Sequence, residues 1–178
     1  MDPYKIVKRE EIFNGKIVRM IVDYIELSNG KIAQREIVLH HRSGVGILPV
    51  DDDGNIFLVR QYRHSLGEHI LEIPAGILED GENPEDCASR ELEEEIGYRA
   101  RKLTFIVAVA KSVGVSNDKI HLYIAQGLEK SVQKLDDDEF LEVEQFGLPQ
   151  CLEMIKSGEL YDAKTILAIQ AYMLMSRE

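Results

Sequence analysis

The chain has 178 residues, enough for one sizeable domain with a core, and its 44% hydrophobic and 30% charged residues are ordinary for a globular protein. Its net charge of −11, with no basic block to offset it, argues against a nucleic-acid partner. Two cysteines are too few for a disulfide framework, and the sequence shows neither an apolar signal core nor an apolar run that could span a membrane. We therefore expect a cytoplasmic protein with no membrane partner.

The N-terminal part is predicted to form a small antiparallel sheet. Strand-like runs cover residues 4–12, 16–27 and 31–39, and Asn-Gly pairs at 14–15 and 29–30 separate them. Asn-Gly between two strand-like runs is a strong hairpin signal. Because three strands bury little by themselves, we expect this sheet to pack on the rest of the chain or on a second subunit.

The rest of the chain alternates between strand-like and helical segments. Strands are predicted at residues 45–50, 55–61, 70–73, 102–110, 119–126 and 139–146, and helices at 84–96, 149–156 and 163–175. A polar loop is expected at 127–138, and the broad apolar stripe of the last helix predicts that it is largely buried. Strands on both sides of a central helix, with further helices at the end, indicate an α/β or α+β sandwich.

The helix expected at 84–96 has clear start and stop signals. Asn83 suits the N-cap, Pro84 suits the first helical position, and Gly97 stands where helices commonly end in a left-handed turn. An apolar stripe recurs every four residues, at Ala88, Leu92 and Ile96.

Three acids share one face of this helix beside the stripe: Glu91, Glu94 and Glu95. They repel one another, and Arg90 can offset only part of this through Glu94, four residues on. A hard divalent cation such as Mg²⁺ would neutralise them, since it prefers carboxylate oxygens. The alternative is a solvated acidic face, which is the usual meaning of a run of glutamates.

The wider stretch resembles the signature of the Nudix hydrolase family. The matching residues are Gly76, Glu82, Arg90, Glu91, Leu92, Glu94, Glu95, Gly97 and Tyr98. Only Tyr98 departs, where the family has an aliphatic residue. The resemblance implies a loop–helix–loop that holds Mg²⁺ or Mn²⁺ and cleaves a diphosphate linked to another moiety. It also implies a Nudix-type α/β/α sandwich with a mixed sheet at residues 43–178, after an N-terminal antiparallel sheet at residues 1–42.

The expected metal site combines the helix with the loop before it. We take Glu91 and Glu95, four residues apart on one face, as the main metal ligands. The resemblance adds Glu94, as a ligand or as the holder of a metal-bound water, and the carbonyl group of Ala75. Arg90 is expected to orient a glutamate, and Glu82 to support the site.

The general base is expected in a loop after the helix. The segment LDDDEFLEVEQF resembles the loop from which relatives that cleave ADP-ribose take a glutamate, and Glu139 is the matching position. Glu142 and Asp138 are the alternatives, and a merely solvated acidic loop is the competing interpretation.

Three further segments resemble the ADP-ribose pyrophosphatase branch of the family. They are residues 57–82, with Arg63 and Glu72 at matching places, residues 111–125, and residues 161–169. In the second segment Val113 stands where proline is usual, beside Gly114. The N-terminal sheet, with Arg35 and Glu36, resembles the dimerising sheet of that branch, in which a nearby arginine contacts substrate from the neighbouring chain.

The resemblance implies a homodimeric, Mg²⁺-dependent hydrolase that converts ADP-ribose to AMP and ribose 5-phosphate. Arg63 is the first candidate to grip a phosphate and Arg35 the second, with Glu36 and Gly114 also at the substrate; Arg35 could equally be a paired surface charge. The adenine-stacking residue stays open among Tyr4, Phe13 and Tyr24. The alternatives are a pyrophosphatase for other nucleoside diphosphate sugars, a sensor that binds ADP-ribose without cleaving it, and a purely structural acidic protein.

Overall fold

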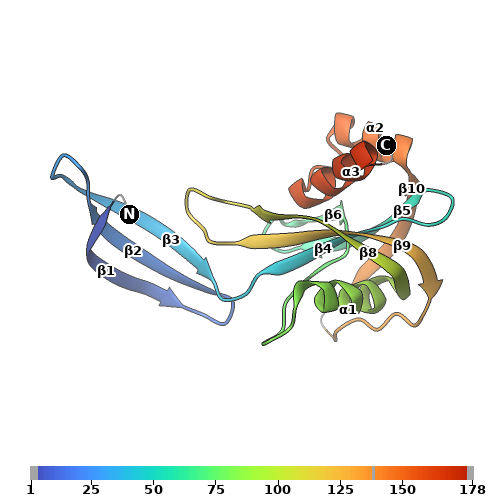
Figure 1. Cartoon of the computed structure of the whole chain (residues 1–178), viewed down its shortest axis with the longest axis horizontal. Helices are drawn as coiled ribbons and strands as arrows, with labels where there is room; N and C mark the ends of the chain where they lie inside the picture. Colours follow the sequence, from blue (N-terminus) through green and yellow to red (C-terminus); the bar gives the residue numbers. More distant parts are fainter. Residues whose placement is uncertain (1–3, 138, 176–178) are drawn as a thin grey trace. The chain divides into compact units, whose positions relative to one another are not determined.

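The computed structural model describes residues 4–137 and 139–175, and the chain divides into two compact units (Figure 1). The first unit contains the residues up to 43 together with 110–119, and the second contains the rest. Among the described residues, no helix combines the length and the apolar character needed to cross a membrane.

The first unit is built on a three-stranded antiparallel sheet. Its strands, in spatial order, are β1 (Lys5–Asn14), β2 (Val18–Glu26) and β3 (Ile32–His40). The three strands predicted from the two Asn-Gly pairs are therefore confirmed. Gly30 has a φ of 78°, a left-handed conformation that glycine adopts without strain, in the turn between β2 and β3. Residues 110–119 join this unit next to β3, where the N–H of Val38 donates to the carbonyl of Val115 (2.8 Å).

The remaining strands and helices form a layered α/β structure. In chain order they are β4 (Gly44–Pro49), β5 (Asn55–Arg63), β6 (Glu68–Glu72), β7 (Ala75–Ile77), α1 (Pro84–Ile96), β8 (Tyr98–Ala110), β9 (Lys119–Lys130), β10 (Leu141–Gly147), α2 (Leu148–Ser157) and α3 (Ala163–Met175). One sheet has the order β10-β5-β6 and the other β7-β4-β9-β8, in which β4 runs parallel to β9 and antiparallel to β7. Within this unit α1 lies on one side of the sheets and α2 and α3 on the other, which is the predicted α/β/α sandwich with a mixed sheet (Figure 1).

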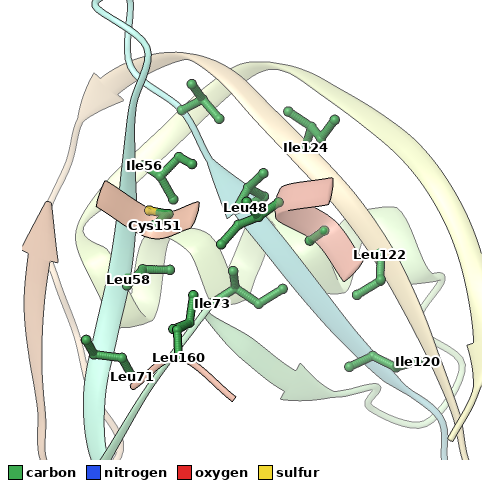
Figure 2. Close-up of a cluster of buried hydrophobic side chains, with 13 residues drawn as sticks. Leu48, Ile56, Leu58, Leu71, Ile73, Ile120, Leu122, Ile124, Cys151 and Leu160 are labelled. Carbon is green, nitrogen blue, oxygen red and sulfur yellow. The ribbon is translucent and has the colours of Figure 1, made fainter. Parts of the chain in front are cut away.

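Alternate residues of the central strands enter two different cores. The core facing α2 and α3 includes Leu48, Ile56, Leu58, Leu122, Cys151 and Ile169 (Figure 2). The core facing α1 includes Val45, Ile47, Phe57, Val59, Ala88 and Leu92. Because successive side chains of a strand point to opposite faces, a strand between two helical layers must be apolar on both. This explains why β4 and β5 read as nearly continuous apolar runs.

Helix α1 begins and ends where its sequence signals predict. The Oδ1 of Asn83 accepts hydrogen bonds from the N–H groups of Glu85 and Asp86, both at 3.0 Å. Gly97 ends the helix with a φ of 71°, and its N–H donates to the carbonyl of Glu93 (2.9 Å). These caps fix the two ends of the helix that carries the acidic face.

Two predictions about the second half of the chain were wrong. The loop expected at 127–138 begins later, because β9 continues to Lys130 beside β8. Sheet hydrogen bonds join backbone groups, so polar side chains do not end a strand that still has a neighbour. Helix α3 is also less buried than expected: of its 13 residues Thr165, Ala168 and Ile169 are fully buried, whereas Leu174 is 62% exposed.

Candidate active site

The acidic face of α1 is turned into the protein. Glu95 is 1% exposed and Glu91 is 8% exposed, whereas the side chain of Glu94 is 38% exposed. Two of the three acids are therefore buried, and the alternative of a fully solvated acidic face is wrong. A buried carboxylate is unfavourable unless hydrogen bonds or opposite charge compensate it, so the partners of each acid define the site.

Arg90 binds three of the surrounding carboxylates. Its Nε and Nη2 each lie 3.0 Å from an oxygen of Glu82, and its Nη1 lies 2.7 Å from Glu91 Oε1 and 2.9 Å from Glu94 Oε2. The hydrogen bonds from Arg90 lower the pKa of Glu82 to about 2. Arg90 thus makes the contacts that its expected orienting role requires, and it also ties the loop before α1 to the helix.

The negative charge of Glu95 has fewer favourable partners than that of Glu82. Its Oε2 accepts a hydrogen bond from the N–H of Ala75 at 3.0 Å. Burial raises the pKa of Glu95 to about 8, and the neighbouring charge of Glu91 adds to this, while the Ala75 N–H works in the opposite direction. The charge of Arg63 also acts on Glu95, but burial and the neighbouring acids outweigh it, so the ionised form of Glu95 would gain from a further positive charge.

Gly76 makes room for the carboxylate of Glu91. A Cβ at position 76 would overlap that carboxylate, so a larger residue would push the Glu91 side chain away. Burial raises the pKa of Glu91, and Arg90 lowers it. The glycine that opens the family signature is thus explained sterically, by the close approach of a buried acid to the backbone.

The oxygen donors at the start of β7 and on α1 are of the type that a hard divalent cation binds. They consist of carboxylate oxygens and backbone groups, the ligands that Mg²⁺ prefers. The guanidinium of Arg90 contacts three of the carboxylates, those of Glu82, Glu91 and Glu94. Within residues 4–137 and 139–175, no three His, Cys, Asp or Glu side chains converge as a ready-made metal-binding group. Instead, oxygens of Glu91 and Glu94 bind Arg90, and Glu95 binds the Ala75 backbone.

A second buried acid lies close by, between two cations. Glu72, at the end of β6, is 1% exposed, and its two oxygens accept hydrogen bonds from Arg63 Nε (2.6 Å) and Nη2 (2.9 Å). Lys164 of α3 also binds Glu72, and it pairs with Asp162 at 3.0 Å. Arg63 is therefore held in one orientation, with Nη1 as the nitrogen on the other edge of the guanidinium.

The expected general base lies in the loop between β9 and β10. Glu139 is half-buried, its N–H donates to the carbonyl of Asp136 (3.0 Å), and its charge raises the pKa of both Glu91 and Glu95. Glu142, the first alternative, is an exposed residue of β10 opposite Arg60 in the strand register. Asp138, the second alternative, lies outside the described residues.

Three predicted substrate-binding residues belong to the first unit. Arg35 and Glu36 are exposed residues of β3, and Gly114 lies in the turn at 112–116. The Nη1 of Arg35 donates to the carbonyl of Gln34 (2.8 Å). Asp23, the acid opposite Arg35 in the register, is bound by Arg9 instead, through two hydrogen bonds of 2.6 and 2.8 Å.

Sequence reasoning missed two residues near the site. Lys164 binds Glu72 across 92 positions of the chain, and Gln133 donates to the carbonyl of Glu95 across 38 positions. Helical or strand periodicity relates only neighbours within one element, so it contains no signal for either contact. The resemblance at residues 161–169 marked the segment of Lys164 but not its partner.

Comparison with known proteins places the chain in a family. The NUDIX domain profile matches residues 40–167, and the chain belongs to the NUDIX family. The chain is 46% identical to an ADP-ribose pyrophosphatase of Bacillus subtilis (strain 168) and 42% identical to a methanol dehydrogenase activator of Bacillus methanolicus. Each alignment covers 96% of this chain and 92% of the relative.

A solved structure shows the same fold. The crystal structure of an ADP compounds hydrolase superposes with a TM-score of 0.90, covering 99% of this chain and 96% of the other, at 23% sequence identity. The protein is thus a Nudix hydrolase in fold and family, and the family signature coincides with the acidic face of α1.

Proposed function

We propose that the protein hydrolyses the diphosphate bond of ADP-ribose to AMP and ribose 5-phosphate, with Mg²⁺ or Mn²⁺ as cofactor. One water adds to a phosphorus atom, the bond from that phosphorus to the bridging oxygen breaks, and each product leaves with one phosphate. The observation that supports this best is the burial of Glu91 and Glu95 beside Ala75, on the signature helix. The 46% identity to an ADP-ribose pyrophosphatase over 96% of the chain supports the choice of substrate.

The metal ligands that we propose are Glu91, Glu95, Glu94 and the carbonyl group of Ala75. An ion held there would screen the negative charge of the diphosphate and favour attack by water. Arg90 would hold Glu91 and Glu94 at the ion, since its Nη1 already contacts both.

Glu139 is the general base that we propose, because its charge acts on Glu91 and Glu95 whereas Glu142 lies opposite Arg60. It would accept the proton of the attacking water. Replacing Glu139 by Gln should lower kcat by ~10²–10⁴-fold, and the matched variant Glu142→Gln should stay close to the wild type. Equal losses in the two variants would reject Glu139 as the base.

Arg63 would bind a phosphate of the substrate. The two bonds to Glu72 use its Nε and Nη2, which leaves the donors of Nη1 for an anion, and its side chain is 37% exposed. Arg35, Glu36 and Gly114 would contact the substrate from the first unit, with Arg35 as the second phosphate ligand from the partner of a homodimer.

The first unit offers a surface for that homodimer. Its strand β1 and the preceding residue expose large apolar side chains, including Tyr4, Ile6, Val7, Ile12 and Phe13. We propose residues 1–42 as the dimerisation subdomain. Light scattering coupled to size exclusion should give the mass of two chains, and replacing Ile12 and Phe13 by Lys should give that of one.

A panel of nucleoside diphosphate compounds tests the activity directly. The pure protein with Mg²⁺ should release AMP and ribose 5-phosphate from ADP-ribose faster than it cleaves GDP-mannose or UDP-glucose, and EDTA should abolish the release. Faster cleavage of another sugar nucleotide would indicate that this compound, and not ADP-ribose, is the preferred substrate. Binding of ADP-ribose without any AMP would indicate a sensor instead.

A further inference from the structure

A short segment after β9 is hydrogen-bonded to the C-terminal end of α1. We call residues 131–134 the strap. The N–H of Ser131 donates to the carbonyl of Gly97 (2.7 Å), and the N–H of Lys134 donates to the carbonyl of Glu94 (3.0 Å). The Nε2 of Gln133 donates to the carbonyl of Glu95 (2.6 Å). The last carbonyls of a helix have no partner within the helix, and here the strap supplies partners for those of two acids of the site.

The strap and the helix end approach each other closely. A Cβ at Gly97 would lie 2.9 Å from the backbone nitrogen of Gln133, closer than side chains normally come to backbone. The Oγ of Ser131 also donates to Glu93 Oε1 at 2.5 Å. Gly97 is therefore needed for two reasons, its φ of 71° and the space that the strap occupies.

The strap also leads directly to the proposed general base. Only residues 135–138 separate Lys134 from Glu139, whose charge reaches Glu91 and Glu95. One end of this connection is hydrogen-bonded to the last turn of α1, and the other carries the loop acid. The N–H of Glu139 donates to the carbonyl of Asp136 (3.0 Å), so the loop acid is hydrogen-bonded to the segment that follows the strap.

We propose that Gln133 is a positioning residue of the active site, which fixes the last turn of α1 through the carbonyl of Glu95 and holds the strap, from which the chain continues to Glu139. This inference rests on the proposed function, in which Glu95 binds the metal and Glu139 is the base. Gln133 is largely exposed, so water can replace its hydrogen bond at little cost in stability. A water molecule bound at the Glu95 carbonyl would not link the strap to the helix. Removing the Gln133 side chain is therefore expected to disturb the geometry of the site rather than folding.

The first test measures the connection itself, without substrate or metal. The variant Gln133→Met keeps the length of the side chain and removes its N–H donors, and Val132→Ala is the matched control, because Val132 is 77% exposed in the same strap. Hydrogen exchange should accelerate at the amides of Ser131 and Lys134 in Gln133→Met and stay unchanged in Val132→Ala. Equal exchange in Gln133→Met and the wild type would overturn the proposal.

The second test separates positioning from simple stability. In Gln133→Met, kcat for ADP-ribose should fall about 10-fold while KM stays within about two-fold, as for groups that support metal ligands. Mn²⁺ affinity, measured by electron paramagnetic resonance, should weaken in the same variant. Faster exchange with unchanged kcat and Mn²⁺ affinity would mean that the strap is only structural, and would overturn the proposal. If the wild type cleaves no diphosphate at all, the proposed function fails, whereas exchange and Mn²⁺ affinity still decide the role of Gln133.

Discussion

Two buried glutamates of the second unit have the same exposure and very different surroundings. Glu72 and Glu95 are each 1% exposed. Glu72 lies between Arg63 and Lys164, which bind both of its oxygens. Glu95 accepts one backbone hydrogen bond, from Ala75, and lies near the negative charge of Glu91.

The comparison separates an acid whose charge is paired within the fold from an acid that we propose binds a metal ion. Where the chain supplies two cations, the buried carboxylate holds two elements together and orients Arg63. Where no cation of the described residues binds the buried carboxylate directly, as at Glu95, the carboxylate is kept at a cost in stability, and such groups cluster at functional sites. Removing Glu95 should therefore cost mainly activity, whereas removing Glu72 should cost mainly stability, together with the fixed orientation of Arg63.

The largest effect is expected on activity, in Glu95→Gln. With a proposed metal ligand removed, kcat should fall at least about 100-fold, since even groups that only support ligands are worth 10–100-fold. The metal-free variant should melt no lower than the wild type, because a neutral amide replaces a carboxylate that burial disfavours. Glu85→Gln, an exposed acid in the first turn of α1, is the matched control and should keep full activity. Full turnover of Glu95→Gln at saturating Mg²⁺ would contradict the metal assignment.

The opposite outcome is expected for Glu72→Gln. Arg63 loses its carboxylate partner and Lys164 keeps only Asp162. Breaking a buried ion pair typically costs 3–5 kcal/mol, which we reduce to about 3 kcal/mol because Arg63 is partly exposed. Urea unfolding measures this directly. The control Glu68→Gln, on the exposed part of the same strand, should lose less than about 1 kcal/mol. Equal stability in the two variants would remove the basis of the comparison.

Glu95 should make the stability of the metal-free protein depend on pH. The pKa of Glu95 is about 8 in the fold, against an ordinary value of 4.5. Between these values the folded state keeps a proton that the unfolded chain has lost, so stability falls as pH rises. We expect up to about 2 kcal/mol less stability at pH 7 than at pH 5 from this group. The slope should be shallower in Glu95→Gln, and identical slopes in urea titrations with EDTA would contradict the account.

The smallest effect concerns the end of α1. Gly97→Ala places a side chain in a left-handed conformation, at about 1 kcal/mol, and also against the strap. Gly81→Ala is the matched control, because Gly81 has a φ of 83° with open space where its Cβ would be. Gly97→Ala should unfold at a lower urea concentration than Gly81→Ala. Equal urea midpoints for the two variants would mean that the strap moves aside at no measurable cost in stability.

The sequence predicts those parts of the molecule that depend on neighbours in the chain. Asn83, Pro84 and Gly97 fix the bounds of α1, and the spacing of Glu91 and Glu95 places both acids on one face, because each signal acts within one helix. The extension of β9 to Lys130 was not predictable in this way, since it depends on pairing with β8.

The contacts of the site divide in the same way, into those between chain neighbours and those between distant segments. Glu82, Glu91 and Glu94 each lie within eight positions of Arg90 in the sequence, and an orienting role could be predicted. The contact of Lys164 with Glu72 joins segments 92 residues apart, and only folding brings them together. Through that long-range contact, Lys164 helps to compensate the buried negative charge of Glu72, and within the described part of the chain Glu95 has no such contact.

The most direct measurement is the position of Mn²⁺ in a crystal grown with that ion, located by its anomalous scattering. The account predicts a peak bonded to carboxylate oxygens of Glu91 and Glu95, with both side chains turned toward the ion. A peak elsewhere, or Glu91 and Glu95 pointing away from it, would contradict the claim that these buried acids bind a metal ion.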